Sequence, residues 1–416
     1  MKLPSLVGAL LLASNALTLS QPMQELSLKN AIQIALEANP EILSARRGID
    51  AANGRFWRGV SPPPASLSWN YDYIPTGTGV SGYGERRIEI SQSIEFPTTI
   101  ALRGSSLSYE TDASDADYRY ATLAVTLQVK EAYFGVLASQ QKLLLADENL
   151  SIAEDFAHKA EIRNNVGEGT PLELLTAKVQ RTQARNAVES ARNDLRIATG
   201  VLGLALGRGR TQPSREFLLT DSLVYRPILL VLDSLVEEAQ YSNPQVQSAG
   251  FKATAASVNR SIAWSSLLPS LSFSYSKQVQ AGNSNLYGMS FGISLPVWFL
   301  FDQRGQVQEA TATYARAESE LLAKQNIVSL DVRNAYLEYS NDERQVRLFQ
   351  TDLLPQAREV YRSAATSYDA GEITYLEFLQ ARQTLVSARS SYIDALYHFN
   401  AAVARLEKAV GRSLGE

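Results

Sequence analysis

The feature that most limits what this chain can fold into is an internal duplication. Asn39-Pro40 returns as Asn243-Pro244, and the segment 66–71, SLSWNY, falls with the same offset on SLSFSY at 270–275. Later matches with nearly the same offset are Gly167-Glu168 with Gly371-Glu372 and Gly207-Arg208 with Gly411-Arg412. Because matches this far apart keep one register, we predict two copies of one structural unit of roughly 190 residues.

The duplication also predicts the domain organisation. We place the first repeat at residues 21–212 and the second at 228–416. A linker at 213–227, which contains Pro213, joins them.

Residues 1–20 have the pattern of a secretory signal peptide. Lys2 precedes the apolar run 6–12, and small and polar residues follow, with cleavage after Ala16 or Ser20 both fitting the pattern. The run is too short to span a bilayer. We therefore expect an exported chain, and no later stretch reaches 18 uninterrupted apolar residues.

Most of each repeat has helical periodicity. Residues 28–38 and 41–60 are predicted helices, separated at Asn39-Pro40 because proline lacks a backbone donor and constrains its predecessor. A long helix over about 103–165 carries apolar residues at coiled-coil spacing and turns at a glycine into a return helix, 171–207. The second repeat has the same long helix and the return helix 374–411.

Four short segments instead alternate between apolar and small polar residues, which predicts strands of period two. Their apolar positions are Leu67, Trp69, Tyr71 and Tyr73; Ile88, Ile90, Ile94 and Phe96; Leu271, Phe273 and Tyr275; and Tyr287, Met289, Phe291, Ile293 and Leu295. This pattern suits a transmembrane barrel wall better than a soluble hairpin. A soluble hairpin would need a core against which to pack its apolar face, but the neighbouring coiled coils already bury their own apolar seams. Four strands cannot close in lipid, so several chains must combine. Two chains would give eight strands, and three would give twelve with room for water.

Composition excludes several other classes. The formal net charge of −4 argues against a nucleic-acid binder, and the absence of cysteine excludes disulfides and zinc–cysteine sites. Residues 77–82 satisfy G-x-G-x-x-G but lie between two strands, so we interpret them as a loop. His158 and His398 have no ligand-spaced partner. We therefore expect no catalytic residues, no cofactor and no dedicated metal site.

With these features in place, the chain resembles the TolC family of outer-membrane efflux proteins. The resemblance covers essentially the whole mature chain and rests on the double repeat, on Ala38-Asn39-Pro40 and Ser242-Asn243-Pro244, and on the turns 166–173 and 370–377. Leu295-Pro296 followed by Phe301-Asp302-Gln303-Arg304-Gly305 is similar to the strand-to-helix junction of the heavy-metal-efflux, CzcC-like branch.

The resemblance implies a mainly α protein with membrane β structure. Long antiparallel coiled-coil helices would form an α-barrel in the periplasm, and four strands per chain would contribute to a 12-stranded β-barrel of a homotrimer in the cell outer membrane. The partners implied are a periplasmic adaptor (membrane fusion protein), an inner-membrane pump and outer-membrane lipid. Such a protein is no enzyme but a passive conduit for metal cations or small molecules. The alternatives are the outlet of a type I protein secretion system, a soluble periplasmic coiled-coil adaptor and an outer-membrane barrel enzyme.

The resemblance also nominates functional residues at the two helical turns. The adaptor-docking tips are Val166, Gly167, Leu172, Glu173, Gly371 and Leu376. The two glycines also serve as ordinary helix C-caps, since glycine adopts φ > 0 freely. Of two carboxylate positions that ring the narrow end in family members, Glu377 matches one, whereas Gln380 occupies the other. Tyr368 matches a latch tyrosine, and Ile373 stands where the family has a latching arginine.

Two further expectations follow for these positions. Three Glu377 carboxylates near one axis would favour cations, whereas the alternative is a solvated surface glutamate. Four tyrosines of the predicted strands, Tyr71, Tyr73, Tyr275 and Tyr287, are candidates for an interfacial aromatic girdle, with ordinary sheet packing as the alternative.

Overall fold

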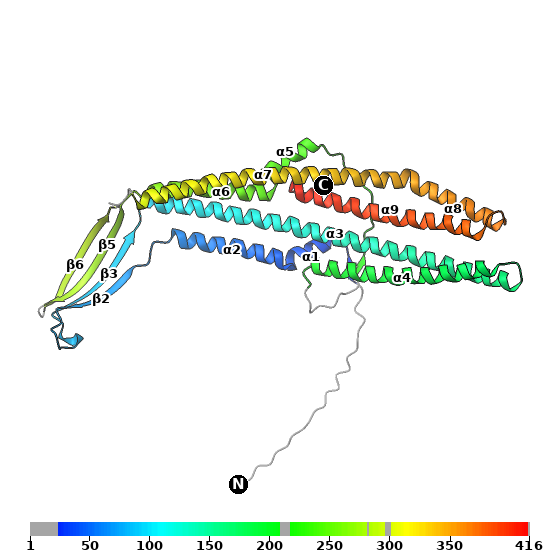
Figure 1. The fold of residues 1–416 in the computed structure, drawn as a ribbon. Helices are drawn as coiled ribbons and strands as arrows, with labels where there is room; N and C mark the ends of the chain where they lie inside the picture. The colour runs from blue at the N-terminus through cyan, green and yellow to red at the C-terminus, as the bar shows by residue number, and fades with distance from the viewer. Residues whose placement is uncertain (1–23, 209–216, 281–282, 296–300, 415–416) are drawn as a thin grey trace, which may run out of the picture.

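The computed structural model describes residues 24–208, 217–280, 283–295 and 301–414. The predicted signal peptide, Pro213 of the predicted linker and Pro296 lie outside these ranges. The chain forms an elongated bundle of long helices with a sheet at one end and two helical turns at the other (Figure 1).

The two repeats contain corresponding elements in the same order. The first contains β1 (Gln24–Leu26), α1 (Leu28–Ala38), α2 (Pro40–Val60), β2 (Ser66–Asp72), β3 (Glu85–Ile94), α3 (Pro97–Asn165) and α4 (Pro171–Ala205). The second contains β4 (Phe217–Leu219), α5 (Leu232–Ser242), α6 (Pro244–Ser265), β5 (Ser270–Gln280), β6 (Asn283–Ser294), α7 (Asp302–Leu348), α8 (Leu354–Asp369) and α9 (Tyr375–Val410). The predicted helices and strands are thus confirmed in kind and order, with α3 starting six residues earlier, at Pro97. Tyr73, Phe96 and Leu295, which were expected to continue the strand alternation, lie just beyond the ends of β2, β3 and β6.

Two features differ from the sequence prediction. Part of the predicted linker forms β4, which pairs in parallel with β1, so that Glu25 lies opposite Leu218. The long helix of the second repeat is interrupted by a π-helical turn, Phe349–Leu353, between α7 and α8. Pro355 lies at the start of α8 and has no N–H to continue the ladder, which accounts for a wider turn there.

The helices form a curved layer around α3. Helices α2 and α4 lie along one side of α3, while α6 and α9 lie along its other side and separate it from α7 (Figure 1). Helix α8 packs on α9. The layer therefore ends in two long helical edges, one made by α2 and α4 and the other by α7 and α8.

Asn39 joins α4 to α2 end to end. Its side-chain amide donates to the carbonyl of Ala205 at the end of α4 (3.0 Å), and its side-chain oxygen accepts from the N–H of Glu41 at the start of α2 (2.8 Å). Gly207 adopts φ +76° directly against Ala38, where a Cβ would approach the backbone to 2.6 Å. The motif that revealed the duplication is therefore a helix-to-helix junction, in which one side chain caps two helix ends.

The second repeat builds the same junction from Asn243. This residue donates to the carbonyl of Ala409 (2.8 Å) and accepts from the N–H of Gln245 (2.9 Å). Gly411 has φ +101° beside it, so α9 and α6 meet in the way that α4 and α2 do.

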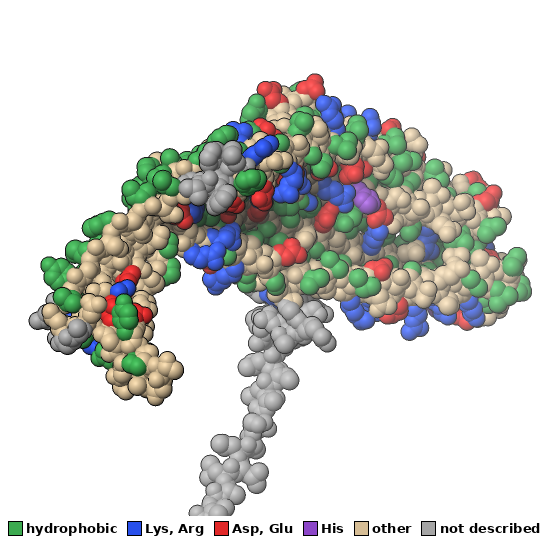
Figure 2. Space-filling view, turned by 60° about the vertical axis from the view of Figure 1, so that its left-hand side comes forward, with side chains coloured by type: hydrophobic (Ala, Val, Ile, Leu, Met, Phe, Trp, Pro, Cys, Tyr) green, Lys and Arg blue, Asp and Glu red, His purple; other side chains and the backbone are tan. Residues whose placement is uncertain are grey.

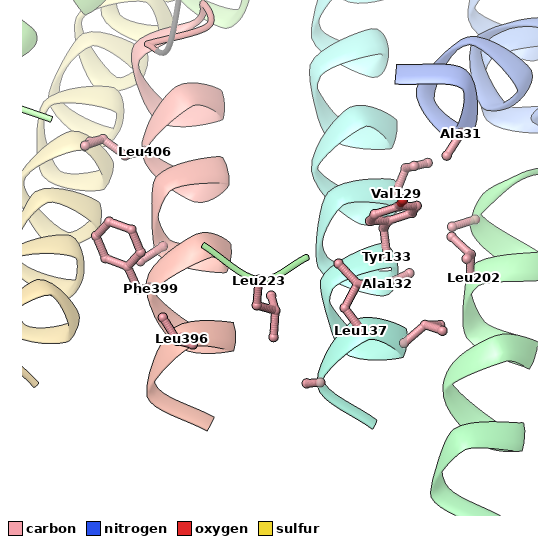
Figure 3. Packing of buried hydrophobic residues seen from close by; sticks show 14 of the residues in the cluster. Ala31, Val129, Ala132, Tyr133, Leu137, Leu202, Leu223, Leu396, Phe399 and Leu406 are labelled. Atoms are coloured by element: carbon pink, nitrogen blue, oxygen red, sulfur yellow. The ribbon is translucent and has the colours of Figure 1, made fainter. Parts of the chain in front are cut away.

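The main hydrophobic core lies at mid-length. Tyr133 of α3 is fully buried there with Val129, Ala31 and Leu202 around it (Figure 3). Its hydroxyl lies 2.8 Å from the carbonyl of Leu26 and 2.7 Å from a carboxylate oxygen of Asp221. The Asp221 carboxylate also accepts from the N–H of Leu28 (2.8 Å). Burial, reinforced by the Asp221 carboxylate, raises the pKa of Tyr133.

The four-stranded sheet has the order β2-β3-β5-β6 and is antiparallel throughout. One cross-strand row consists of Leu67, Ile90, Tyr275 and Met289, all exposed; the adjacent row on the opposite face consists of Ser66, Ser91, Ser274 and Ser290. The predicted alternation is therefore confirmed as two chemically different faces. Figure 2 shows hydrophobic side chains gathered along the outer side of this sheet.

Candidate functional site

The two helical turns opposite the sheet are built alike. Gly167 and Gly371 adopt φ +82° and +76°, and each turn is closed by a backbone bond from the following glutamate. Glu168 N–H donates to the carbonyl of Arg163 (2.9 Å), and Glu372 N–H donates to the carbonyl of Ser367 (2.8 Å). These bonds satisfy helix-end carbonyls, so both glycines have the C-cap role.

The outer surface of the turns is apolar and uncovered. Leu172 is 74% exposed and Leu376, its counterpart in the second repeat, is 67% exposed. Val166 adds a third exposed aliphatic side chain beside Gly167. Among the residues assigned to the docking tips, these three form the solvent-facing apolar part.

Glu173 lies differently, because it faces the second hairpin. The Tyr368 hydroxyl, at the end of α8, donates to a Glu173 carboxylate oxygen at the start of α4 (2.9 Å). Arg163, at the end of α3, lies 3.4 Å from the Tyr368 hydroxyl and 3.6 Å from the Glu173 carboxylate. Burial and the Glu173 carboxylate raise the pKa of Tyr368 to about 12, so its hydroxyl stays protonated and donates.

These contacts bring together residues that the sequence left apart. The sequence nominates Tyr368 as a latch and Glu173 as a docking residue, and the structure places the two in contact. Arg163 was not singled out, because nothing in its local sequence distinguishes it from other surface arginines. It supplies a positive charge to the cluster, where Ile373 provides none.

An aromatic cluster supports this contact. The Tyr368 ring stacks on Phe378 of α9, with centroids 5.2 Å apart, and Phe156 of α3 packs on Phe378 at 4.7 Å. Tyr375 closes the cluster, 5.9 Å from Phe156. The two hairpins are therefore held together near the turns by rings and by one polar cluster.

Glu377 completes a capping box at the start of α9. Its carboxylate accepts from the N–H and the hydroxyl of Thr374 (2.8 and 2.9 Å), and its own N–H donates to the Thr374 hydroxyl (3.3 Å). The backbone hydrogen bond from Thr374 lowers the pKa of Glu377, which keeps the carboxylate charged. Gln380 is exposed one turn further along α9.

Three of the four nominated tyrosines lie in strands, Tyr73 directly follows β2, and all four are exposed. Tyr71 and Tyr73 lie at the end of β2 towards the β2–β3 loop, and Tyr287 lies opposite Lys277 near the β5–β6 loop. Tyr275 lies further from the loops, opposite Met289. Three of the four are therefore near the loop end of the sheet, and Tyr275 belongs to the middle of the apolar face.

The described ranges lack the features of two other kinds of site. No described helix combines the length and the apolar composition needed to cross a membrane. Within the same ranges, no three His, Asp or Glu side chains are grouped so that they could hold a metal ion. The G-x-G-x-x-G segment forms the β2–β3 connection, with a short 3-10 turn at Val80–Gly82.

Comparison with known proteins gives consistent matches over most of the chain. The family model described as "Outer membrane efflux protein" matches residues 77–208 and 235–412. The cobalt-zinc-cadmium resistance protein CzcC of Cupriavidus metallidurans is 23% identical over 388 residues, covering 93% of this chain and 90% of that protein. The outer membrane protein TolC of Vibrio cholerae is 23% identical over 425 residues, covering 95% and 92%. The crystal structure of the Campylobacter jejuni CmeC outer membrane channel shares the fold, with a TM-score of 0.77, 17% identity and coverage of 94% and 87%.

Proposed function

The chain belongs to the outer membrane efflux protein family, and we propose that it is the outer-membrane exit duct of a tripartite efflux pump. The observation that carries this proposal is the uncovered apolar face of the four-stranded sheet. In a tripartite pump such a duct is passive, because an inner-membrane transporter supplies the energy. The chain then contributes a shaped passage and docking surfaces, with no chemical step of its own.

The sheet has the two faces that a membrane wall needs. Phe291 is 81% exposed and pairs with Phe273, while the rows on the opposite face are largely serine, glycine and charged residues. No described helix packs across the apolar face. Lipid would cover such a face, and water would fill the space behind the serine rows.

Closure of the sheet calls for further copies of the chain. Among the described strands, β2 and β6 each have one neighbour, so each has an edge that no described strand pairs. Unpaired backbone groups in lipid cost several kcal/mol each, which favours pairing β2 of one copy with β6 of the next. Three copies would make a twelve-stranded barrel wide enough for water.

The helical edges favour the same assembly. Helix α4 exposes Leu175, Val179, Ile197, Val201 and Leu204, while α7 exposes Leu322, Ile327, Leu330, Leu337 and Leu348. In a closed ring, the α2–α4 edge of one copy meets the α7–α8 edge of the next. This packing would bury apolar side chains that the single chain leaves in water.

The helical turns would be the periplasmic end and would bind the adaptor. Val166, Leu172 and Leu376 give each turn an apolar surface on a rigid glycine-capped frame. The contact between Tyr368, Glu173 and Arg163 would hold the two hairpins together in the closed state. Glu377 and Gln380 would face the narrow passage. In a trimer the three Glu377 side chains would form one ring of carboxylates, whereas the three Gln380 side chains would form an uncharged ring.

The cargo favoured for this duct is metal cations or small molecules. The resistance to cobalt, zinc and cadmium named for the CzcC relative supports cations, as does a carboxylate at the proposed narrow end. Selection itself would belong to the inner-membrane partner. Type I protein secretion is the second candidate, because the same tube would accept an unfolded polypeptide.

Single-channel recording tests the proposal directly. The full chain, purified in detergent, is added to a planar bilayer beside its Glu377→Ala variant. We expect small, steady, cation-selective steps, with weaker cation selectivity in the variant. A chain that stays in solution without detergent and gives no steps would refute the duct, and a soluble adaptor would then be the better explanation.

A further inference from the structure

A buried arginine without a counter-charge lies between the two hairpins, away from the turns. Arg382 of α9 is only 5% exposed. One guanidinium nitrogen, Nη2, donates to the main-chain carbonyl and the side-chain oxygen of Asn149 on α3. Within the described ranges, its Nε and Nη1 groups have no hydrogen-bond partner, and no carboxylate lies within ion-pair distance.

Two comparisons within the chain show that the burial of Arg382 without a carboxylate is particular to this position. Arg389, two turns further along α9, pairs with Glu148 at 2.6 Å. The residue of the first repeat that corresponds to Arg382 is Lys178, which is exposed and lies 3.9 Å from Glu161. Burying a guanidinium away from water is costly unless an anion or several acceptors compensate it.

Arg382 lines a cavity of about 200 Å³ bounded by α3, α4 and α9. The other polar residues of the lining are Asn149, Gln180, Gln183 and Gln383, and the rest are alanine, leucine and valine. None of the lining residues is acidic. The guanidinium supplies only donors, and each carboxamide supplies N–H donors beside its acceptor oxygen. The guanidinium keeps a full positive charge because arginine does not deprotonate in proteins.

From this geometry we propose that the cavity is a binding site for a small inorganic anion, a halide or a compact oxyanion. The anion accepts from the free N–H groups of Arg382 and from the carboxamides of Gln180 or Gln183 on α4. It thereby joins α4 of the first hairpin to α9 of the second. The site is separate from the Tyr368 contact, since the two share no residue.

The test uses the full chain in detergent and bromide as the probe. Crystals grown with bromide are examined for anomalous density, which we expect beside the Arg382 guanidinium. In solution, the thermal midpoint is followed as bromide replaces gluconate at constant ionic strength. Arg382→Gln should weaken the apparent bromide affinity by at least about tenfold, because it removes the charged donors.

Two further variants keep the result interpretable. Arg389→Gln removes a paired arginine from the same helix and should leave the bromide response unchanged. Arg382→Lys keeps the charge without the planar fork and should retain a weaker response, even if Arg382→Gln does not fold. The proposal is overturned if no bromide lies at Arg382, if a carboxylate of a neighbouring copy occupies the cavity, or if Arg389→Gln loses the response equally.

Discussion

Placing an arginine at Phe291 distinguishes a membrane wall from a soluble sheet. Phe291 is the middle one of five exposed apolar residues at every second position, of which Tyr287, Met289, Phe291 and Ile293 lie in β6 and Leu295 directly follows it. At about 3.3 Å per residue, it lies roughly 13 Å from either end of this apolar stretch. Phe291→Arg would therefore put a charge near the middle of the membrane, at a cost of about 2–4 kcal/mol per chain. Three copies would lose about 6–12 kcal/mol. On a soluble sheet, so exposed a position would change stability by less than about 0.5 kcal/mol.

The neighbouring residue provides the matched control. Ser290 lies next to Phe291 but faces the opposite side, where its hydroxyl is 2.8 Å from that of Ser274. Ser290→Arg adds the same charge to the proposed water-filled side. The assay is urea-dependent folding into lipid vesicles, read as the fraction of assembled protein. We expect a large loss of assembly for Phe291→Arg and little for Ser290→Arg, and equal midpoints for the two variants would refute the membrane assignment.

Three other predictions concern the hairpins and the helix junctions. Tyr368→Phe removes the hydroxyl that binds Glu173, which should destabilise the closed state by about 1–2 kcal/mol. Bilayer recordings should then show a roughly tenfold larger open-channel fraction. Tyr361→Phe on the same helix is the control and should leave that fraction unchanged. Asn39→Ala removes the cap of α4 and the cap of α2 together, so the free energy of unfolding in detergent should fall by about 2–3 kcal/mol. An unchanged thermal midpoint would contradict the capping role of Asn39. The lowered pKa of Glu377 means that its capping contribution is complete above its unfolded pKa and is lost as the pH falls through the lower folded value. Amide exchange in the first turn of α9, corrected for intrinsic rates, should therefore become faster at acid pH in the wild type. The Thr374→Val variant lacks the hydroxyl of the capping box and should not show this acid-dependent increase.

Local patterns explain why much of the architecture was predictable. The helix break at Asn39-Pro40 and the alternation through Leu67 and Trp69 depend on neighbours a few residues apart, and these neighbours also determine the backbone. The duplication strengthened every such prediction, because each pattern was present twice. The glycine turns were found for the same reason, since φ > 0 at Gly167 and Gly371 is a local requirement.

The candidate site was only partly predictable. Tyr368 could be nominated from the resemblance, but its partners could not, because Glu173 is 195 residues away from it in the sequence. Arg163 and Arg382 read as ordinary surface arginines in the sequence. In the structure, Arg163 contacts Tyr368 of the second hairpin, and Arg382 is buried against Asn149.

The internal duplication, the helices, the amphipathic strands and the positions of the turns could all be read from the sequence, because they depend on spacing along the chain. The pairing of β4 with β1, the contact of Asp221 with Tyr133 and the capping of two helices by Asn39 became visible only in the folded chain. The fold also buries Arg382 against Asn149, with no carboxylate within ion-pair distance among the described residues. These features depend on contacts between segments that are far apart in the sequence, and no local pattern specifies which distant segment will meet which.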